Sequence, residues 1–158
     1  MKRTGVLLIL LFAFAGLADS AYLAQHETSG TPLICTIENL TGCNIVAQSP
    51  YSEVFGVPLA VYGILFYAIV FALAALELAL FDRFLRRALQ CLAVFGVLIS
   101  LYSVALQIFI IQALCVYCLG SALLALGIGC IASLLEPLRG SAAAPNLPTP
   151  GLTMPPAA

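Results

Sequence analysis

The sequence predicts an all-α integral membrane protein: a bundle of four transmembrane helices with an extracytoplasmic loop between the first and second. Three observations predict this fold: the composition, the lengths of the apolar runs and the placement of the cations. Of the 158 residues, 63% are hydrophobic and 8% are charged, whereas soluble domains carry about 25% charged residues. A chain this apolar has no water-soluble interior large enough for its side chains, which indicates a bilayer.

The apolar runs define the helices. The first covers 4–24, the second covers 57–80, and from Ala88 to Leu135 there is no charged residue. One helix through this last run would overshoot a bilayer about twofold at ~1.5 Å rise per residue, so the run must turn back once. We expect the turn near 112–114, because Gln107 and Gln112 interrupt the apolar run there. The predicted helices are therefore 4–24, 57–80, 88–112 and 115–135, with an outer loop at 25–56.

The cations predict the orientation. All six lie at positions that a four-span topology puts on one side of the membrane: Lys2, Arg3, Arg83, Arg86, Arg87 and Arg139. Cytoplasmic segments carry the excess of Lys and Arg, so we expect a multi-pass protein of the cell membrane with both termini in the cytoplasm. The loop 25–56 and the active site then face outward. The sequence has no basic stripe, so no nucleic-acid partner is expected.

The two ends of the chain differ from the predicted membrane domain, 1–139. Residues 140–158 are rich in Pro, Ala and Gly without apolar periodicity, which predicts a disordered cytoplasmic tail. The N-terminal segment also has features of a cleaved signal peptide, because Lys2 and Arg3 precede an apolar stretch and small residues follow at 18–21. That stretch is long for a signal peptide, so we expect it to be the first spanning helix.

The predicted topology divides the six cysteines by side. Cys91 and Cys130 fall in the cytoplasmic halves of the third and fourth helices, where a lone cysteine is expected to act as a small hydrophobe. The other four lie at the outer face, where disulfides persist: Cys35, Cys43, Cys115 and Cys118. These four are the candidate catalytic residues.

The pair Cys115 and Cys118 stands at a predicted helix start. Side chains three residues apart share a face there, and the free N–H groups stabilise a thiolate. Such a pair can exchange with a second pair through a mixed disulfide, and Cys35 and Cys43 would be that second pair. Two alternatives stay open: two structural disulfides that staple a non-enzymatic membrane scaffold, or a four-cysteine zinc site, which the eight-residue spacing fits poorly. The residues favour the redox relay, and we expect no metal.

A redox relay needs a final electron acceptor. The sequence has no Gly-rich phosphate loop and no haem signature, and a lipid-soluble quinone is the acceptor that keeps the bacterial periplasm oxidising. A quinone site needs an apolar pocket with a few hydrogen-bond donors, and the segment 44–58 offers Ser49 and Phe55 as candidates. An ordinary turn, in which Pro50, Gly56 and Pro58 break the backbone, accounts for the same segment equally well.

These residues together resemble the vitamin K epoxide reductase family, and more particularly its prokaryotic members. The shared pattern is a Cys, a second Cys eight residues on, a Ser six further on, then Phe-Gly and a CxxC at the last helix. Here it reads Cys35, Cys43, Ser49, Phe55-Gly56 and Cys115-Val116-Tyr117-Cys118. The segments 20–26 and 62–67 are also similar to that family, and the resemblance covers roughly 16–135.

The resemblance implies a role for each residue. Cys35 exchanges with a reduced thioredoxin-like protein, and Cys43 passes the electrons to Cys115. Cys118 is the thiolate beside the quinone, and Ser49 hydrogen-bonds a quinone oxygen. The implied activity is a thiol oxidase that reduces a membrane quinone, of menaquinone or ubiquinone type, and supports disulfide formation. Some prokaryotic members carry a fused thioredoxin-like domain, whereas this chain ends in the Pro/Ala tail, so a separate partner is implied.

Two departures from the family pattern bear on the substrate. The animal enzymes have a Tyr four residues after the CxxC, where this chain has Ala122. They also have an Asn in the pocket helix, before the Gly of the segment that matches 62–67, at the position that Leu59 occupies here. Both departures put vitamin K epoxide reduction in doubt more than quinone reduction. Quinone reduction coupled to disulfide formation is therefore the favoured prediction, and a vitamin K epoxide or quinone reductase proper is the alternative.

Overall fold

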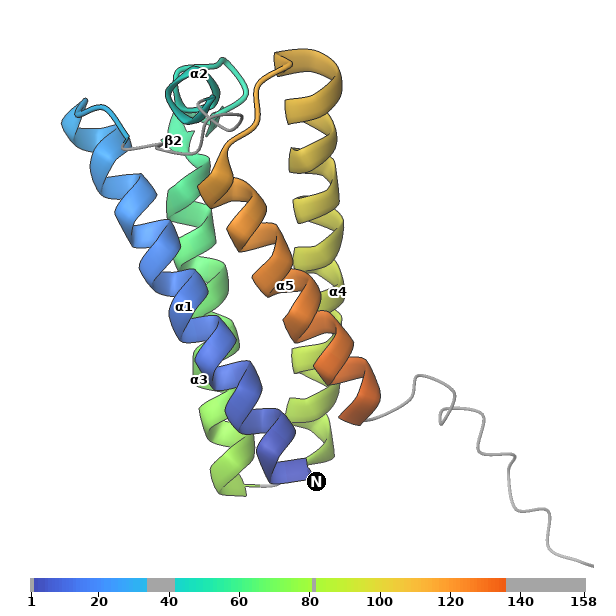
Figure 1. Ribbon diagram of the computed structural model, residues 1–158. Coiled ribbons are helices and arrows are strands. Elements are labelled where there is room, and N and C mark those ends of the chain that lie inside the picture. The colour runs from blue at the N-terminus through green and yellow to red at the C-terminus, as the bar shows by residue number, and fades with distance from the viewer. Residues whose placement is uncertain (1, 34–41, 81, 136–158) are drawn as a thin grey trace, which may run out of the picture.

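Four long helices run side by side and form the body of the molecule (Figure 1). The computed structural model describes residues 2–33, 42–80 and 82–135. The four helices are α1 (Lys2–Ser29), α3 (Leu59–Leu80), α4 (Arg83–Leu106) and α5 (Val116–Leu135). Each is long and apolar enough to cross a membrane, α4 together with the π-helix η1 (Gln107–Ile111) that continues it. This confirms the predicted all-α bundle of four transmembrane helices.

The four helices pack in a ring, in the order α1, α3, α4 and α5, with α5 closing against α1. Their shared core consists largely of aliphatic and small side chains: Val6, Ile9, Ala13, Tyr67, Val70, Ala74, Leu89, Ala93, Ile128 and Ala132. Small residues let helix backbones approach closely in a bilayer. Gly16 is such a position, because a Cβ there would overlap the buried Tyr67 ring. Large apolar side chains such as Leu11, Phe14 and Leu98 are exposed on the outside of the ring, as lipid contact requires.

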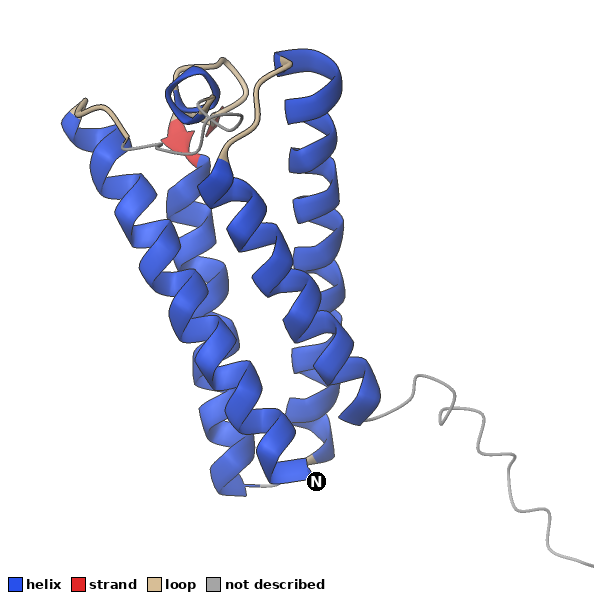
Figure 2. Cartoon of the chain, viewed as in Figure 1, coloured by secondary structure: helices blue, strands red, loops and turns tan. Residues whose placement is uncertain are grey.

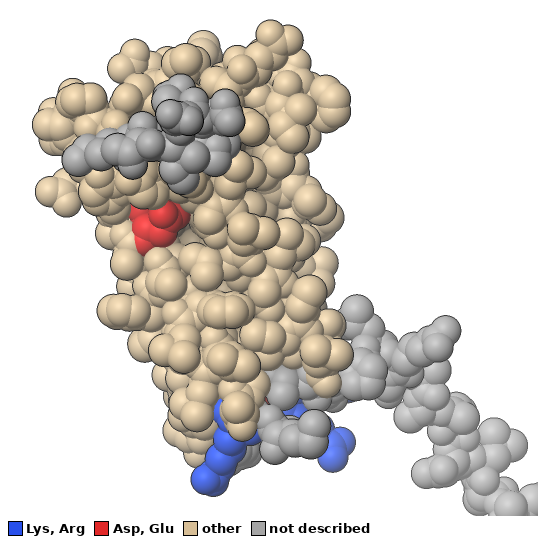
Figure 3. All heavy atoms as spheres, viewed as in Figure 1, with Lys and Arg blue, Asp and Glu red and all other residues tan. Residues whose placement is uncertain are grey.

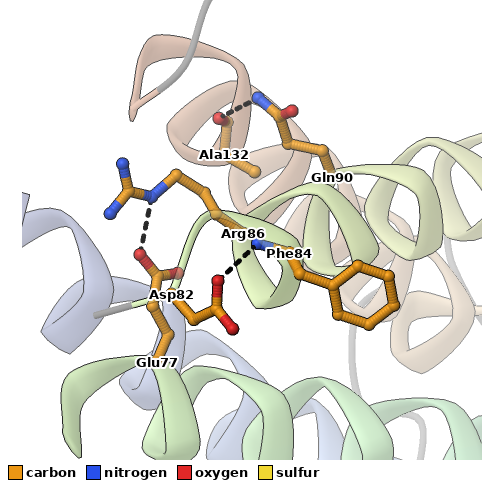
Figure 4. Close-up of polar contacts among 6 residues, drawn as sticks. All are labelled: Glu77, Asp82, Phe84, Arg86, Gln90 and Ala132. Atoms are coloured by element: carbon orange, nitrogen blue, oxygen red, sulfur yellow. Dashed lines mark hydrogen bonds and ion pairs between the residues drawn. The ribbon is translucent and has the colours of Figure 1, made fainter. Parts of the chain in front are cut away.

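One end of the bundle, here called the cation end, carries the arginines that the structure describes, at the starts of α1 and α4: Arg3, Arg83, Arg86 and Arg87. On the face shown in Figure 3, the basic side chains lie at this end of the molecule. α4 begins at Arg83 rather than near residue 88, because the Asp82 carboxylate accepts a hydrogen bond from the Phe84 N–H (3.0 Å) and caps the helix. Figure 4 shows this cap together with the buried ion pair between Arg86 and Glu77 (2.7 Å).

The opposite end, here called the loop end, carries the short elements (Figure 2). α2 (Cys43–Ala47) and the antiparallel strands β1 (Glu53–Val54) and β2 (Val57–Pro58) lie there, above the ends of the long helices. Tyr62 of α3 ties the hairpin down, because its hydroxyl donates to the Val54 carbonyl (3.1 Å). α1 runs to Ser29, past its expected end at 24, so the predicted outer loop begins later than expected.

The long uncharged run breaks between Ile111 and Val116, where the amides predicted a turn. The break follows η1 and contains Gln112, whose backbone is left-handed (φ 54°). It directs the chain back toward the cation end as α5 (Figure 1). The predicted tail, 140–158, lies outside the described residues.

Candidate redox site

Two of the predicted catalytic cysteines lie in one buried cluster at the loop end. Cys43 and Cys115, at 0% and 1% exposure, share this cluster with Leu33. Cys118 packs against the same cluster and is half-buried. Residues more than seventy positions apart in the sequence are thus brought together by the fold. Cys35 lies outside the described residues.

Cys43 reaches this position as the first residue of α2. The preceding Gly42 packs directly on the chain before Cys115: a Cβ on Gly42 would lie 2.8 Å from the Ala113 Cβ and 2.9 Å from the Leu114 nitrogen. Only a residue without a side chain can approach so closely, so Gly42 brings the loop against the start of α5. Cys43 is disulfide-bonded, whereas Cys115 and Cys118 are free thiols. The structure therefore represents a state without a Cys43–Cys115 bond.

Cys115 is the N-cap of α5. Its carbonyl accepts the first helical hydrogen bond, from the Leu119 N–H (3.0 Å), and its sulfur accepts the Cys118 N–H (3.4 Å). A side-chain acceptor at the N-cap satisfies an N–H of the first turn that would otherwise lack a partner. Its own N–H donates to the side-chain oxygen of buried Gln107 (3.0 Å). The first turn of the helix therefore points its N–H groups at the Cys115 sulfur.

These contacts lower the pKa of Cys115. The largest cause is the hydrogen bond from the Cys118 thiol, and the N–H groups of Cys118 and Tyr117 act in the same direction. Burial and the carboxylate of Asp19 oppose the shift. A lowered pKa makes a cysteine a better leaving group in disulfide exchange, and Cys115 is the cysteine of the CxxC that is buried in one cluster with Cys43.

Tyr22 and Tyr117 pack against the cysteine cluster and were not singled out as site residues from the sequence. Their ring centroids are 5.2 Å apart, and the Tyr22 ring also lies 4.4 Å from that of His26. Tyr117 stands inside the CxxC and Tyr22 inside the segment 20–26 that carries the family resemblance. The two rings therefore add apolar surface around the cysteine cluster.

The two predicted quinone contacts lie apart from this cluster. Ser49 is half-buried in the turn after α2, and its hydroxyl donates to the Val46 carbonyl (2.8 Å). Phe55 lies at the tip of the hairpin between β1 and β2, 97% exposed and with a left-handed backbone (φ 55°). The local turn thus explains both residues without a ligand in this arrangement.

An open hollow of about 360 Å³ lies at the loop end, beside the cysteine cluster. Its lining is mixed: it includes polar side chains, among them His26, Glu27, Asn44 and Glu53, and apolar ones such as Leu33, but none of the described cysteines. A lipid-soluble quinone calls for an apolar pocket, so this hollow fits it poorly. Among the residues that the structure describes, no three His, Cys, Asp or Glu side chains gather as metal ligands.

The remaining cysteines, Cys91 and Cys130, are free and exposed on the outside of the bundle. They lie in α4 and α5 toward the cation end, as the sequence predicted for cysteines outside the relay. Both are therefore suitable internal controls for thiol chemistry at the loop end.

Comparison with known proteins agrees with this geometry. A family model described as "Vitamin K epoxide reductase family" matches residues 7–133. A thiol-disulfide oxidoreductase of Arabidopsis thaliana, LTO1, is 44% identical over 57 residues, which are 36% of this chain and 15% of that protein. The chain therefore spans a small part of the curated relative that it matches.

Proposed function

The chain belongs to the vitamin K epoxide reductase family, and from this membership and the burial of Cys43 with Cys115 we propose that it is a membrane thiol–disulfide oxidoreductase. It takes electrons from a reduced thioredoxin-like protein through Cys35 and Cys43. It passes them through Cys115 and Cys118 to a membrane quinone of menaquinone or ubiquinone type. The observation that carries the proposal is the single buried cluster that holds Cys43 and Cys115.

The relay consists of two exchanges between the pairs. The Cys43 thiolate attacks the Cys115 sulfur of an oxidised CxxC, which forms the Cys43–Cys115 bond and releases the Cys118 thiolate. The Cys35 thiolate then attacks Cys43, which forms the Cys35–Cys43 disulfide and releases Cys115. Two electrons have moved from the loop pair to the helix pair. The free thiols of Cys115 and Cys118 are compatible with a reduced helix pair.

The reduced CxxC then becomes a disulfide again by giving two electrons and two protons to the quinone, which leaves as the hydroquinone. Cys118 is the proposed quinone-side thiolate, since the attack of Cys43 on Cys115 releases it and it remains in the reduced pair that the quinone then oxidises. Ser49 and Phe55 remain proposed quinone contacts. To donate a hydrogen bond to a quinone oxygen, the Ser49 hydroxyl must release its hydrogen bond to the Val46 carbonyl. Ala122 and Leu59, which replace the animal family residues, favour a quinone over an epoxide.

The proposed orientation puts the cation end in the cytoplasm and the loop end outside. It is supported by the basic side chains at the cation end (Figure 3) and by the rule that cytoplasmic segments carry the excess of Lys and Arg. Thiols outside the cytoplasm meet an oxidising environment. The cluster of Cys43 and Cys115 then stands where exported proteins acquire their disulfides.

The activity is tested with the full chain in lipid nanodiscs, a reduced thioredoxin-like protein and a soluble quinone whose absorbance falls on reduction. We expect quinone reduction that is abolished by Cys43→Ser, Cys115→Ser and Cys118→Ser. Cys91→Ser and Cys130→Ser are matched controls, because both cysteines are free and lie away from the cluster. Quinone reduction that survives Cys118→Ser, or that fails equally in the control variants, would overturn the proposal.

A further inference from the structure

Gln107 holds the chain that leads into Cys115 with two hydrogen bonds. Its backbone carbonyl accepts the Ala113 N–H (3.2 Å), and its side-chain oxygen accepts the Cys115 N–H (3.0 Å). The side chain is 2% exposed. It begins the π-helix η1, and such widened turns often occur at functional sites. The short connection between η1 and α5 is therefore fixed at both of its ends by one residue.

The two bonds around Cys115 complete a helix cap. In the usual capping box, the N-cap side chain accepts the N–H of the third helical residue, and the side chain of that residue accepts the N-cap N–H. Here the third helical residue is Cys118, whose N–H goes to the Cys115 sulfur. A cysteine at that position makes a poor reciprocal acceptor, since sulfur accepts hydrogen bonds weakly. Gln107 supplies the missing acceptor from the neighbouring helix.

We infer that Gln107 is a positioning residue of the relay: it fixes Cys115 as the helix cap, with its sulfur over the free N–H groups of α5 and beside Cys43. This inference rests on the proposed function. The Cys115 thiolate is the leaving group when Cys35 attacks Cys43 of the Cys43–Cys115 disulfide. Anything that stabilises this thiolate speeds its departure. Without the Gln107 amide, the buried Cys115 N–H lacks its acceptor, which costs free energy in the arrangement that holds the sulfur over α5.

A purely structural role makes a different prediction, and the chain offers a matched control. Gln90 of α4 is another buried glutamine, and its amide donates to the Ala132 carbonyl of α5 (2.9 Å), as Figure 4 shows. Gln90 thus ties α4 to α5 toward the cation end, and Gln107 ties η1 to the start of α5 at the loop end. Gln107 accepts a hydrogen bond from a cysteine of the cluster, whereas the hydrogen bond of Gln90 to Ala132 lies toward the other end of the bundle.

The test measures alkylation of Cys115 in the reduced full chain in nanodiscs, as a function of pH, with peptide mass spectrometry to resolve each cysteine. Gln107→Met preserves the side-chain length and removes the amide. We expect it to slow Cys115 alkylation about five- to tenfold near neutral pH. This fold-change corresponds to the free energy of one buried hydrogen bond that completes a helix cap. The midpoint of the pH profile should move upward. Gln107→Asn, whose shorter side chain does not reach, should move it the same way if Gln107→Met folds poorly.

Gln90→Met is expected to lower thermal stability about as much as Gln107→Met does. It should leave the pH profile of Cys115 alkylation unchanged. The inference is overturned if Gln107→Met keeps the original pH profile, or if Gln90→Met shifts it equally. Alkylation requires neither quinone nor a protein partner. Absence of quinone reduction by the unaltered chain would therefore refute the proposed function and leave the result on Gln107 intact.

Discussion

Asn44 holds Leu33 with both ends of its amide: its oxygen accepts the Leu33 N–H (2.8 Å), and its nitrogen donates to the Leu33 carbonyl (3.3 Å). Leu33 precedes and Asn44 follows the chain segment that contains Cys35. Asn44 is also the residue directly after Cys43. The two hydrogen bonds therefore join the flanks of this segment and fix where α2 begins.

We expect Asn44→Ala to weaken this closure and to slow electron transfer from the loop pair. The loss of two hydrogen bonds that are partly shielded from water should cost about 1–3 kcal/mol of stability. The measurement is the rate at which Cys115 and Cys118 become reduced in a single turnover, after a reduced thioredoxin-like protein is added to the oxidised chain. Gln48→Ala is the control, because Gln48 is exposed just after α2. Equal rates for the two variants would contradict this role of Asn44.

Gly42→Ala should separate the two cysteine pairs. The added Cβ would meet the Ala113 Cβ at 2.8 Å and the Leu114 nitrogen at 2.9 Å, so the backbone of the loop must move away from the start of α5. A displacement of about 1 Å at a reacting centre can cost on the order of a hundredfold in rate. We expect the same single-turnover experiment to show slower reduction of Cys115 and Cys118.

Gly120→Ala is the matched control for this prediction. Gly120 lies two residues after Cys118, and a Cβ there has no neighbour within 4 Å. The substitution is the same and the distance to the CxxC is short, yet no backbone is displaced. If both variants retain the rate of the unaltered chain, the close approach of Gly42 has no part in the exchange.

The sequence was sufficient for the helices and the family, because both depend on local signals. An uncharged run too long for one span must turn, and the break falls at 112–115, between η1 and α5. The start of α4 was predicted too late, since apolarity begins after 88 while the helix begins at the Asp82 cap. Charged residues at a helix end carry little hydropathy signal even where they form helix.

The contacts that make the site were beyond the sequence, because they join distant residues through backbone atoms. Nothing local marks Gly42 as the residue that touches Leu114, or Asn44 as the partner of Leu33. Gln107 did carry a signal: an amide in an uncharged membrane run needs a hydrogen-bond partner. Its partner, the Cys115 N–H, could not be named without the π-helix that aims the side chain there.

The buried ion pair between Arg86 and Glu77 should matter for stability and not for redox chemistry. Their side chains are 11% and 3% exposed, and they join α4 to α3 at the cation end (Figure 4). Removing one partner of a buried pair leaves an uncompensated charge, which typically costs about 3–5 kcal/mol. We expect Arg86→Met to lower the thermal midpoint in detergent much more than Arg87→Met, since Arg87 is exposed. Equal midpoints would show that the pair contributes nothing.

The lowered pKa of Cys115 predicts the pH dependence of the reduced chain. A thiol whose pKa is lower in the folded state contributes stability above its unfolded value and loses it as the pH falls through the folded value. For Cys115 the window lies between its lowered pKa and its ordinary value of 9.0. The folded chain should therefore react with iodoacetamide at Cys115 at a lower pH than the same cysteine in the denatured chain.

Cys118→Ala tests the physical cause of this shift. The hydrogen bond from the Cys118 thiol is the largest contribution to the lowered pKa of Cys115, so its removal should move the pH midpoint of Cys115 alkylation upward, toward that of the denatured chain. The backbone N–H groups of Cys118 and Tyr117 remain, so part of the shift should persist. Cys130→Ala removes a free thiol outside the cluster and should leave the midpoint unchanged. A midpoint that stays in place in Cys118→Ala would assign the shift to the helix N–H groups alone.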